Sequence, residues 1–122
     1  LADLGPRPSP EHTIGRIDAD VAEWVVANGA KDAQLAGSTI SFDRAFMRTY
    51  MPQTLAVLHY RNLDVSTLNE VARRFWPAVY EGRPNAKRTD ADKPHRALDD
   101  ILESITTARY YTERIGPGPR IV

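Results

Sequence analysis

The sequence predicts a helix-rich α/β fold with four helices and two or three short strands. Four stretches repeat apolar residues at helical spacing, beginning near residues 10, 41, 67 and 97. Two short runs, QLAGSTI (34–40) and NLDV (62–65), have the length and composition of strands. The chain has 122 residues, of which 42% are hydrophobic and 26% charged, as expected of one modest globular domain.

Composition excludes several classes of protein. The 16 basic and 16 acidic residues cancel, so overall charge neither favours nor excludes a nucleic-acid partner. The absence of cysteine excludes disulfides and thiolate metal sites, and it is compatible with a cytoplasmic location. No apolar run is long enough to cross a membrane, and no secretory signal pattern is present.

The first helix is predicted to start at Ser9-Pro10-Glu11 and to end at Asn28-Gly29. Its apolar spacing predicts one buried face, with Trp24 in the core rather than stacked on a base. The residues of that face are Ile14, Ile17, Val21, Trp24 and Val25.

A strand over residues 34–40 is predicted to pass into a helix that ends before Pro52. Ser41 or Asp43 could cap this helix, whose inner face would hold Phe46, Met47 and Tyr50. Ligands of open α/β sheets gather at the carboxyl ends of strands, so Asp43 is either a cap or a functional residue.

The middle of the chain contains a turn of helix or a loop over residues 54–58, and then a short strand over residues 62–65. Thr67 and Glu70 have the spacing of a capping box. The helix that they open would bury Leu68, Val71, Ala72 and Phe75. The preceding His59-Tyr60-Arg61 offers a ring for stacking and a guanidinium for phosphate, although a plain surface segment fits equally.

Residues 77–94 have three prolines and a basic cluster, which predict a long, mobile, basic loop. That cluster contains Arg83, Lys87, Arg88 and Lys93. The last helix would bury Leu98, Ile101, Leu102, Ile105 and Ala108, and Tyr110 and Tyr111 near its end would either pack or dock. Residues 116–122 are expected to form a flexible tail. We therefore expect residues 1–122 to form a single, partial domain.

His95-Arg96-Ala97-Leu98-Asp99-Asp100 brings an imidazole and two carboxylates into about one and a half helical turns. Histidine is a frequent general base, and carboxylates are preferred ligands of hard divalent cations. The same acids could also simply favour the helix macrodipole from its first turn. Spacing alone leaves both interpretations open.

Three blocks in fixed order resemble one family. They are AGSTISFDRAFMRTYMP (36–52), HYRNLDVSTLNEVARRFWP (59–77) and HRALDDILES (95–104). They resemble the oligoribonucleases, a group of DEDDh 3′–5′ exonucleases with an RNase H-like fold. The resemblance runs from about Leu35 to Tyr111, and it implies that the chain is the C-terminal part of that fold.

The resemblance implies two-metal hydrolysis of phosphodiesters, with two Mg²⁺ or Mn²⁺ ions. Asp43 and Asp100 match family metal ligands, and His95 matches the base that deprotonates the attacking water. If both residues were on one helix, His95 would share a face with Asp99, four residues on, rather than with Asp100. The family assignment of Asp100 makes sense if His95 lies ahead of the helix.

The substrate implied by the resemblance is RNA a few nucleotides long, which is degraded to mononucleotides. Thr39, Arg61, Ser66 and Thr67 match positions that supply hydroxyl and guanidinium donors to a phosphate. Tyr60 matches a tyrosine that reaches the site from the other subunit of a homodimer. No membrane partner is expected.

The sequence differs from the family pattern in two places, and two hypotheses about its function follow. The family's GNS turn reads Gly37-Ser38-Thr39, and the family's D-x-E motif is absent, since Asp18-Ala19-Asp20 falls within the first predicted helix. The chain is then either part of a truncated exonuclease or a non-catalytic module for nucleotide binding or dimerisation. In either case an exposed strand edge predicts that the isolated chain is unstable or associates.

Overall fold

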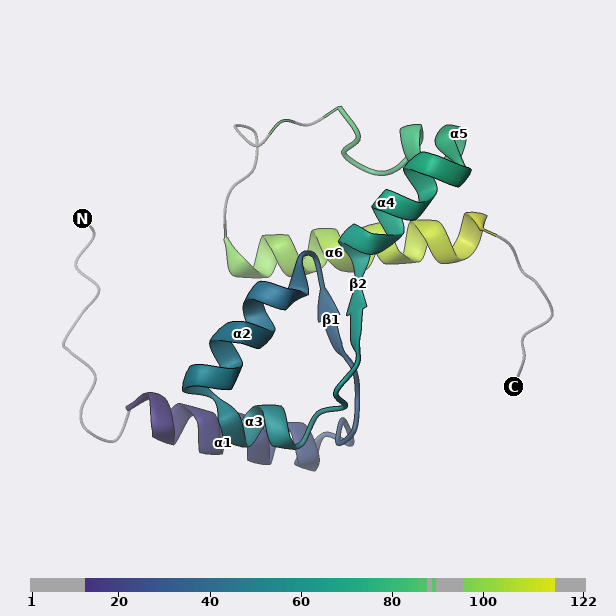
Figure 1. Cartoon of the computed structure of the whole chain (residues 1–122). Helices are drawn as coiled ribbons and strands as arrows, with labels where there is room; N and C mark the ends of the chain where they lie inside the picture. Colours follow the sequence, from purple (N-terminus) through teal and green to yellow (C-terminus); the bar gives the residue numbers. More distant parts are fainter. Residues whose placement is uncertain (1–12, 88, 90–95, 116–122) are drawn as a thin grey trace, which may run out of the picture. The chain divides into compact units, whose positions relative to one another are not determined.

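A computed structural model describes residues 13–87, 89 and 96–115. Within these residues, six helices and two strands follow one another in the order α1, β1, α2, α3, β2, α4, α5 and α6 (Figure 1). The predicted helix-rich α/β class is confirmed. The two helices beyond the four predicted are the short α3 (Pro52–Ala56) and α5 (Pro77–Glu81), each of which has proline in its first turn.

The chain divides into two compact units, which are described separately. Of the described residues, the first unit comprises 13–35 and Ser41–Asn62, and the second comprises Ala36–Ile40, 63–87, 89 and 96–115. No helix within the described ranges is long and apolar enough to cross a bilayer.

Two short strands form the sheet. β1 (Leu35–Gly37) and β2 (Asn62–Asp64) pair in parallel, and α2 (Ile40–Tyr50) and α3 lie between them in the sequence. Both strands fall inside the predicted runs. Parallel strands require such a crossover connection, which helices commonly supply.

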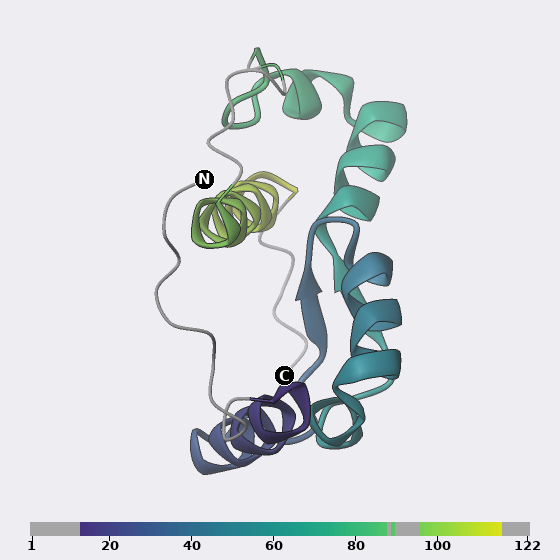
Figure 2. The same ribbon diagram turned by 90° about the vertical axis from the view of Figure 1, so that its left-hand side faces the viewer.

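In the first unit, α1 (Ile14–Ala27) packs beside α3 (Figures 1 and 2). Asp18 of α1 is 1% exposed, and its carboxylate accepts hydrogen bonds from the backbone N–H groups of Gln53 and Thr54. These are otherwise orphan donors in the first turn of α3, so Asp18 caps α3 across the helix pair.

This cap corrects the predicted face of α1. The buried residues are Asp18, Ala22 and Val25, whereas Trp24 is 64% exposed. Turning Asp18 towards α3 rotates the predicted apolar face partly towards solvent. The helix also begins with Thr13 as its N-cap rather than at Ser9, which lies outside the described residues.

The core of the second unit is made by three helices. Ala72 of α4 (Val65–Phe75) packs with Tyr110 and Tyr111 of α6 (Ala97–Arg114). Leu68, Val79 and Tyr80 complete this cluster, and Tyr80 lies in α5. The predicted packing of the two tyrosines is confirmed. The predicted loop over residues 77–94 therefore begins with a helix that contributes to the core.

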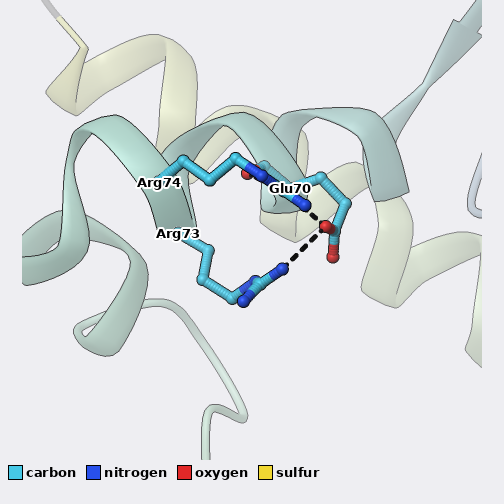
Figure 3. Close-up of polar contacts among 3 residues, drawn as sticks. All are labelled: Glu70, Arg73 and Arg74. Atoms are coloured by element: carbon cyan, nitrogen blue, oxygen red, sulfur yellow. Dashed lines mark hydrogen bonds and ion pairs between the residues drawn. The ribbon is translucent and has the colours of Figure 1, made fainter.

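The capping box predicted at Thr67 and Glu70 is wrong. The N-cap of α4 is Asp64, whose carboxylate accepts the N–H of Ser66 at 2.9 Å. Helix α4 therefore starts at Val65, ahead of Thr67. Glu70 instead contacts Arg73 and Arg74 one turn along the helix (Figure 3). These two guanidinium groups lower the pKa of the Glu70 carboxyl through hydrogen bonds and charge.

Several predicted inner faces are exposed. Leu98 of α6 is 66% exposed, and the other large apolar residues predicted to be buried but found exposed, besides Trp24, are Ile14, Ile17, Phe46, Tyr50, Phe75, Ile101, Leu102 and Ile105. The buried residues of α6 are Thr107, Tyr110 and Tyr111, near its C-terminal end. The predicted tail (116–122), the basic residues Arg88 and Lys93, and His95 lie outside the described residues.

Candidate functional site

The residues that the sequence nominates are distributed over both units. The first unit contains Asp43, Tyr60 and Arg61, and the second contains Thr39, Ser66, Thr67 and Asp100. The candidate base, His95, lies outside the described residues. Since α6 begins at Ala97, His95 precedes the helix in the sequence.

Thr39 and Ser66 form the best-defined part of the site. The N–H of Thr39 donates to Asp64 Oδ1 and to Ser66 Oγ, both at 3.0 Å. The two hydroxyl oxygens of Thr39 and Ser66 lie 3.1 Å apart. Since Asp64 Oδ1 also accepts the N–H of Ser66, one carboxylate oxygen joins the turn after β1 to the start of α4.

Thr39 holds an unusual backbone conformation. Its φ of 53° is in the left-handed region, which β-branched residues rarely adopt. Such a residue costs about 1–3 kcal/mol and persists only where its surroundings fix it. Here the hydrogen bonds to Asp64 and Ser66 fix it, so the turn presents the Thr39 hydroxyl in one defined position.

The start of α4 provides chemistry suited to an anion. Ser66 and Thr67 carry hydroxyl groups in the first helical turn, where backbone N–H groups give a positive end to the helix dipole. The Asp64 carboxylate offsets part of that positive potential. A phosphate here would therefore depend on hydroxyl donors and a nearby cation more than on the helix dipole.

Asp64 is a site residue that the sequence interpretation missed. It was assigned only to the strand over residues 62–65, whereas the structure uses it as an N-cap and as a brace for Thr39. An aspartate two residues before Ser66 at a strand-to-helix junction was the signal, because aspartate is a strong N-cap.

Asp100 lies in the first turn of α6, with Asp99 beside it. Its N–H donates to Arg96 O at 3.0 Å, and its carbonyl oxygen accepts the hydroxyl of Ser104 at 3.0 Å. Ser104 also contacts Ser38 Oγ at 2.7 Å. The helical turn that carries Asp100 is thereby connected to the turn that carries Thr39.

In the first unit, Asp43 lies in the first turn of α2 and is exposed. The neighbouring Arg44 donates from Nε to Asn62 Oδ1 at 2.6 Å and from Nη2 to His59 O at 3.0 Å. These bonds fasten the helix of Asp43 to the segment that contains Tyr60 and Arg61.

The His59-Tyr60-Arg61 segment presents an exposed ring and a guanidinium. Tyr60 is 73% exposed, and the rings of His59 and Tyr60 stack with centroids 4.5 Å apart. The Arg61 guanidinium carbon lies 5.4 Å from the centre of the Tyr60 ring. His59 Nδ1 accepts the N–H of Arg61, which leaves Nε2 as the protonated nitrogen of a neutral ring.

The chemistry of these donors suits a hard divalent cation, but the described set is incomplete. Asp43 and Asp100 belong to different units, and no group of three metal-ligating side chains occurs among the residues described. The sequence contains no D-x-E, and Asp18 of the D-x-D sequence serves as a buried helix cap. Two carboxylates do not make a site for two divalent cations.

The sequence is similar to a family of exonucleases and to several oligoribonucleases. A sequence model described as Exonuclease matches residues 3–108. Oligoribonuclease of Bordetella pertussis is 51% identical over 109 residues, which is 84% of this chain and 55% of that protein. Oligoribonucleases of Leifsonia xyli subsp. xyli and Tropheryma whipplei are 41% and 38% identical, over 52% and 54% of their lengths. The chain spans about half the length of these relatives.

Proposed function

The chain belongs to the exonuclease family, and we propose that it forms part of a 3′–5′ exoribonuclease that degrades very short RNA to mononucleotides. The names of its relatives support the substrate class. The observation that carries the proposal is the cluster of hydroxyls at the start of α4, where Thr39 Oγ1 and Ser66 Oγ lie 3.1 Å apart and Thr67 follows in the same helical turn. Hydroxyl groups gathered in this way are suited to donate hydrogen bonds to one phosphate.

In this proposal the cluster binds the 5′ end of the substrate, together with Arg61. Hydroxyl donors bind phosphate by hydrogen bonds, whereas the guanidinium adds charge and two-point geometry. A site that recognises the end of the strand favours pieces a few nucleotides long. Tyr60 would act in the partner's site of a homodimer, which accords with its exposed ring.

Membership of the family implies use of a divalent metal ion. We assign Asp43 and Asp100 as ligands for Mg²⁺ or Mn²⁺, because hard cations prefer carboxylate oxygens. The remaining ligands must come from outside the described residues, so we derive no reaction step through the metals. We assign His95 the role of accepting a proton from the attacking water, since imidazole titrates near neutral pH.

The alternative candidate function is that the chain binds nucleotides or dimerises without catalysis. Hydrolysis of a 5′-labelled RNA dinucleotide in Mn²⁺ distinguishes the two. Cleavage that is lost in Asp100→Ala supports the enzyme. Binding of the dinucleotide without cleavage supports the second candidate for this chain.

The binding proposal is tested by combining a variant with a change in the ligand. Ser66→Ala should weaken binding of a 5′-phosphorylated RNA dinucleotide about three- to tenfold, the loss expected for one hydrogen bond. It should have no effect on the same dinucleotide without its 5′ phosphate. Ser41→Ala, an exposed serine in α2, is the control. An equal effect on both ligands would contradict phosphate binding at this cluster.

A further inference from the structure

Ser38 and Ser104 connect the turn after β1 to α6 within the second unit. Their hydroxyl oxygens lie 2.7 Å apart, although 66 residues separate them in the sequence. Neither side chain belongs to the phosphate-binding or metal-binding sets assigned above. Direct binding of phosphate or metal therefore does not account for this contact.

The direction of this hydrogen bond follows from counting protons. Ser104 donates its hydroxyl proton to Asp100 O, at 3.0 Å. A serine hydroxyl has one proton, so Ser104 has none left for Ser38. Ser38 is therefore the donor and Ser104 Oγ the acceptor. The result is a directed chain of hydrogen bonds from Ser38 through Ser104 to the backbone of Asp100.

The turn that carries Ser38 and Thr39 is hydrogen-bonded to two different helices. Thr39 bonds to Asp64 and Ser66 at the start of α4, whereas Ser38 bonds to α6. The turn is also closely packed, since a Cβ at Gly37 would lie 2.9 Å from Ile40 Cδ1. A conformation as costly as that of Thr39 needs restraint from more than one direction.

The side-chain hydrogen bond between α4 and α6 lies too far along the helix to fix Asp100. The hydrogen bond from Tyr111 to Asn69 joins these helices 11 residues beyond Asp100, about 16 Å along α6 at 1.5 Å per residue. Ser104 is only one turn from Asp100. The serine pair thus acts near the carboxylate, where a small rotation of the helix matters most.

We propose that Ser38 and Ser104 are positioning residues, which fix the phosphate-binding turn at Thr39 relative to the helical turn that carries Asp100. This inference rests on the proposed function. A substrate bound at Thr39 reacts properly only if Asp100, in the same unit, is held at a fixed distance from it. A displacement of about 1 Å at a reacting centre can cost about 100-fold in rate.

The first test needs no ligand. Ser38→Ala and Ser104→Ala should each speed amide hydrogen exchange at Thr39 about five- to tenfold, as expected for losing one hydrogen bond. The double variant should exchange no faster than either single variant, because both remove the same bond. Exchange at Tyr111 reports on the remainder of the unit and should not change.

The helix offers a matched control and a rescue. The Thr106 hydroxyl donates to Leu102 O, four residues earlier, at 2.9 Å, as the Ser104 hydroxyl does to Asp100 O. Thr106→Ala therefore removes the same type of bond without removing the link to Ser38. Ser104→Thr keeps the hydroxyl and should restore slow exchange. Unchanged exchange at Thr39 in both alanine variants, or the same acceleration in Thr106→Ala, would overturn the proposal.

The second test measures communication between the phosphate-binding turn and the turn of α6 that carries Asp100. In the wild-type chain, a 5′-phosphorylated RNA dinucleotide should slow amide hydrogen exchange at Asp100, because the serine pair connects the two turns. Ser104→Ala should remove this slowing while dinucleotide binding is retained. Ser104→Thr should restore it. A role in folding alone would not change this effect selectively.

The outcomes separate the inference from the proposed function. Coupling that persists in Ser38→Ala and Ser104→Ala overturns the positioning role. A wild-type chain that binds no dinucleotide contradicts the proposed function. In that case the exchange measurements still decide whether the serine pair fixes the turn.

Discussion

At the scale of single residues, Asp18 is the clearest source of pH dependence. Burial raises the pKa of its carboxyl, but hydrogen bonds from the Thr54 hydroxyl, the Thr54 N–H and the Gln53 N–H together lower the pKa by more. The three distances are 2.7, 2.7 and 2.9 Å. The net pKa therefore lies below its ordinary value, and the ionised form is the one that caps α3.

This shift predicts loss of stability in acid. A carboxyl whose folded-state pKa is lowered stabilises the fold above its unfolded pKa of about 3.9, and this stabilisation is lost as pH falls through the folded pKa. Asp18→Asn should therefore flatten the dependence of thermal stability on pH below about pH 4. Thermal unfolding between pH 7 and pH 2 measures it. Asp20→Asn, an exposed residue of the same helix, is the control, and an unaltered slope in Asp18→Asn would contradict the assignment.

Some residues of the candidate site could be predicted from the sequence, and others could not. The resemblance nominated Thr39 and Ser66, and the structure places their hydroxyl groups in contact. It could not reveal Asp64 as the carboxylate that joins them, nor the positive φ of Thr39, because both depend on packing between β1 and α4. The roles of Asp43, Asp100 and His95 stay predictions.

At the scale of helices, sequence predicted their existence better than their orientation. The spacing in α1 predicted core positions for Trp24 and Val25. Val25 is buried as predicted, but the helix face turned inward also carries Asp18 and Ala22, and Trp24 is exposed. A cap that joins residues 36 positions apart leaves no trace in local periodicity. The early proline of α5 marked a helix start that the overall proline content of residues 77–94 concealed.

The packing of α6 on α4 gives a prediction at the same scale. Tyr111 is 1% exposed, and its hydroxyl donates to Asn69 Oδ1 at 2.6 Å. Burial raises the pKa of this phenol, so the hydroxyl stays protonated as the donor. Tyr111→Phe should lower the free energy of unfolding by about 1–2 kcal/mol, because it leaves the Asn69 carbonyl without this donor.

Urea unfolding followed by circular dichroism measures that change. Tyr60→Phe serves as the control, since the Tyr60 ring is exposed and the substitution should alter stability by less than about 0.5 kcal/mol. Equal stability of Tyr111→Phe and the wild-type chain would show that the hydrogen bond to Asn69 contributes nothing net.

At the scale of the whole molecule, the described helices bury little of their apolar surface. Both units leave large apolar side chains exposed, including Trp24 and Phe42 in the first and Phe75 and Leu98 in the second. The chain spans about half the length of its relatives. A fold in which these surfaces were covered would need more protein than the described residues provide.

The exposed face of α6 therefore predicts association of the isolated chain. Leu98, Ile101, Leu102 and Ile105 repeat at helical spacing and are all exposed, which makes one continuous apolar strip. Sedimentation velocity from about 1 to 100 µM should show a rising average mass, because contiguous exposed apolar surface favours association. Replacing Ile101 and Ile105 together by glutamine should shift the chain towards the monomer.

A control variant establishes whether this strip is responsible. Leu63→Gln removes an exposed apolar side chain on β2 and should leave the association unchanged. If the wild-type chain stays monomeric throughout, the exposed strip on α6 is not sufficient to drive association. If Leu63→Gln and the α6 double variant dissociate the chain equally, association depends on total exposed apolar surface rather than on α6. Selective dissociation by the α6 variant would identify this helix face as the surface through which the chain associates.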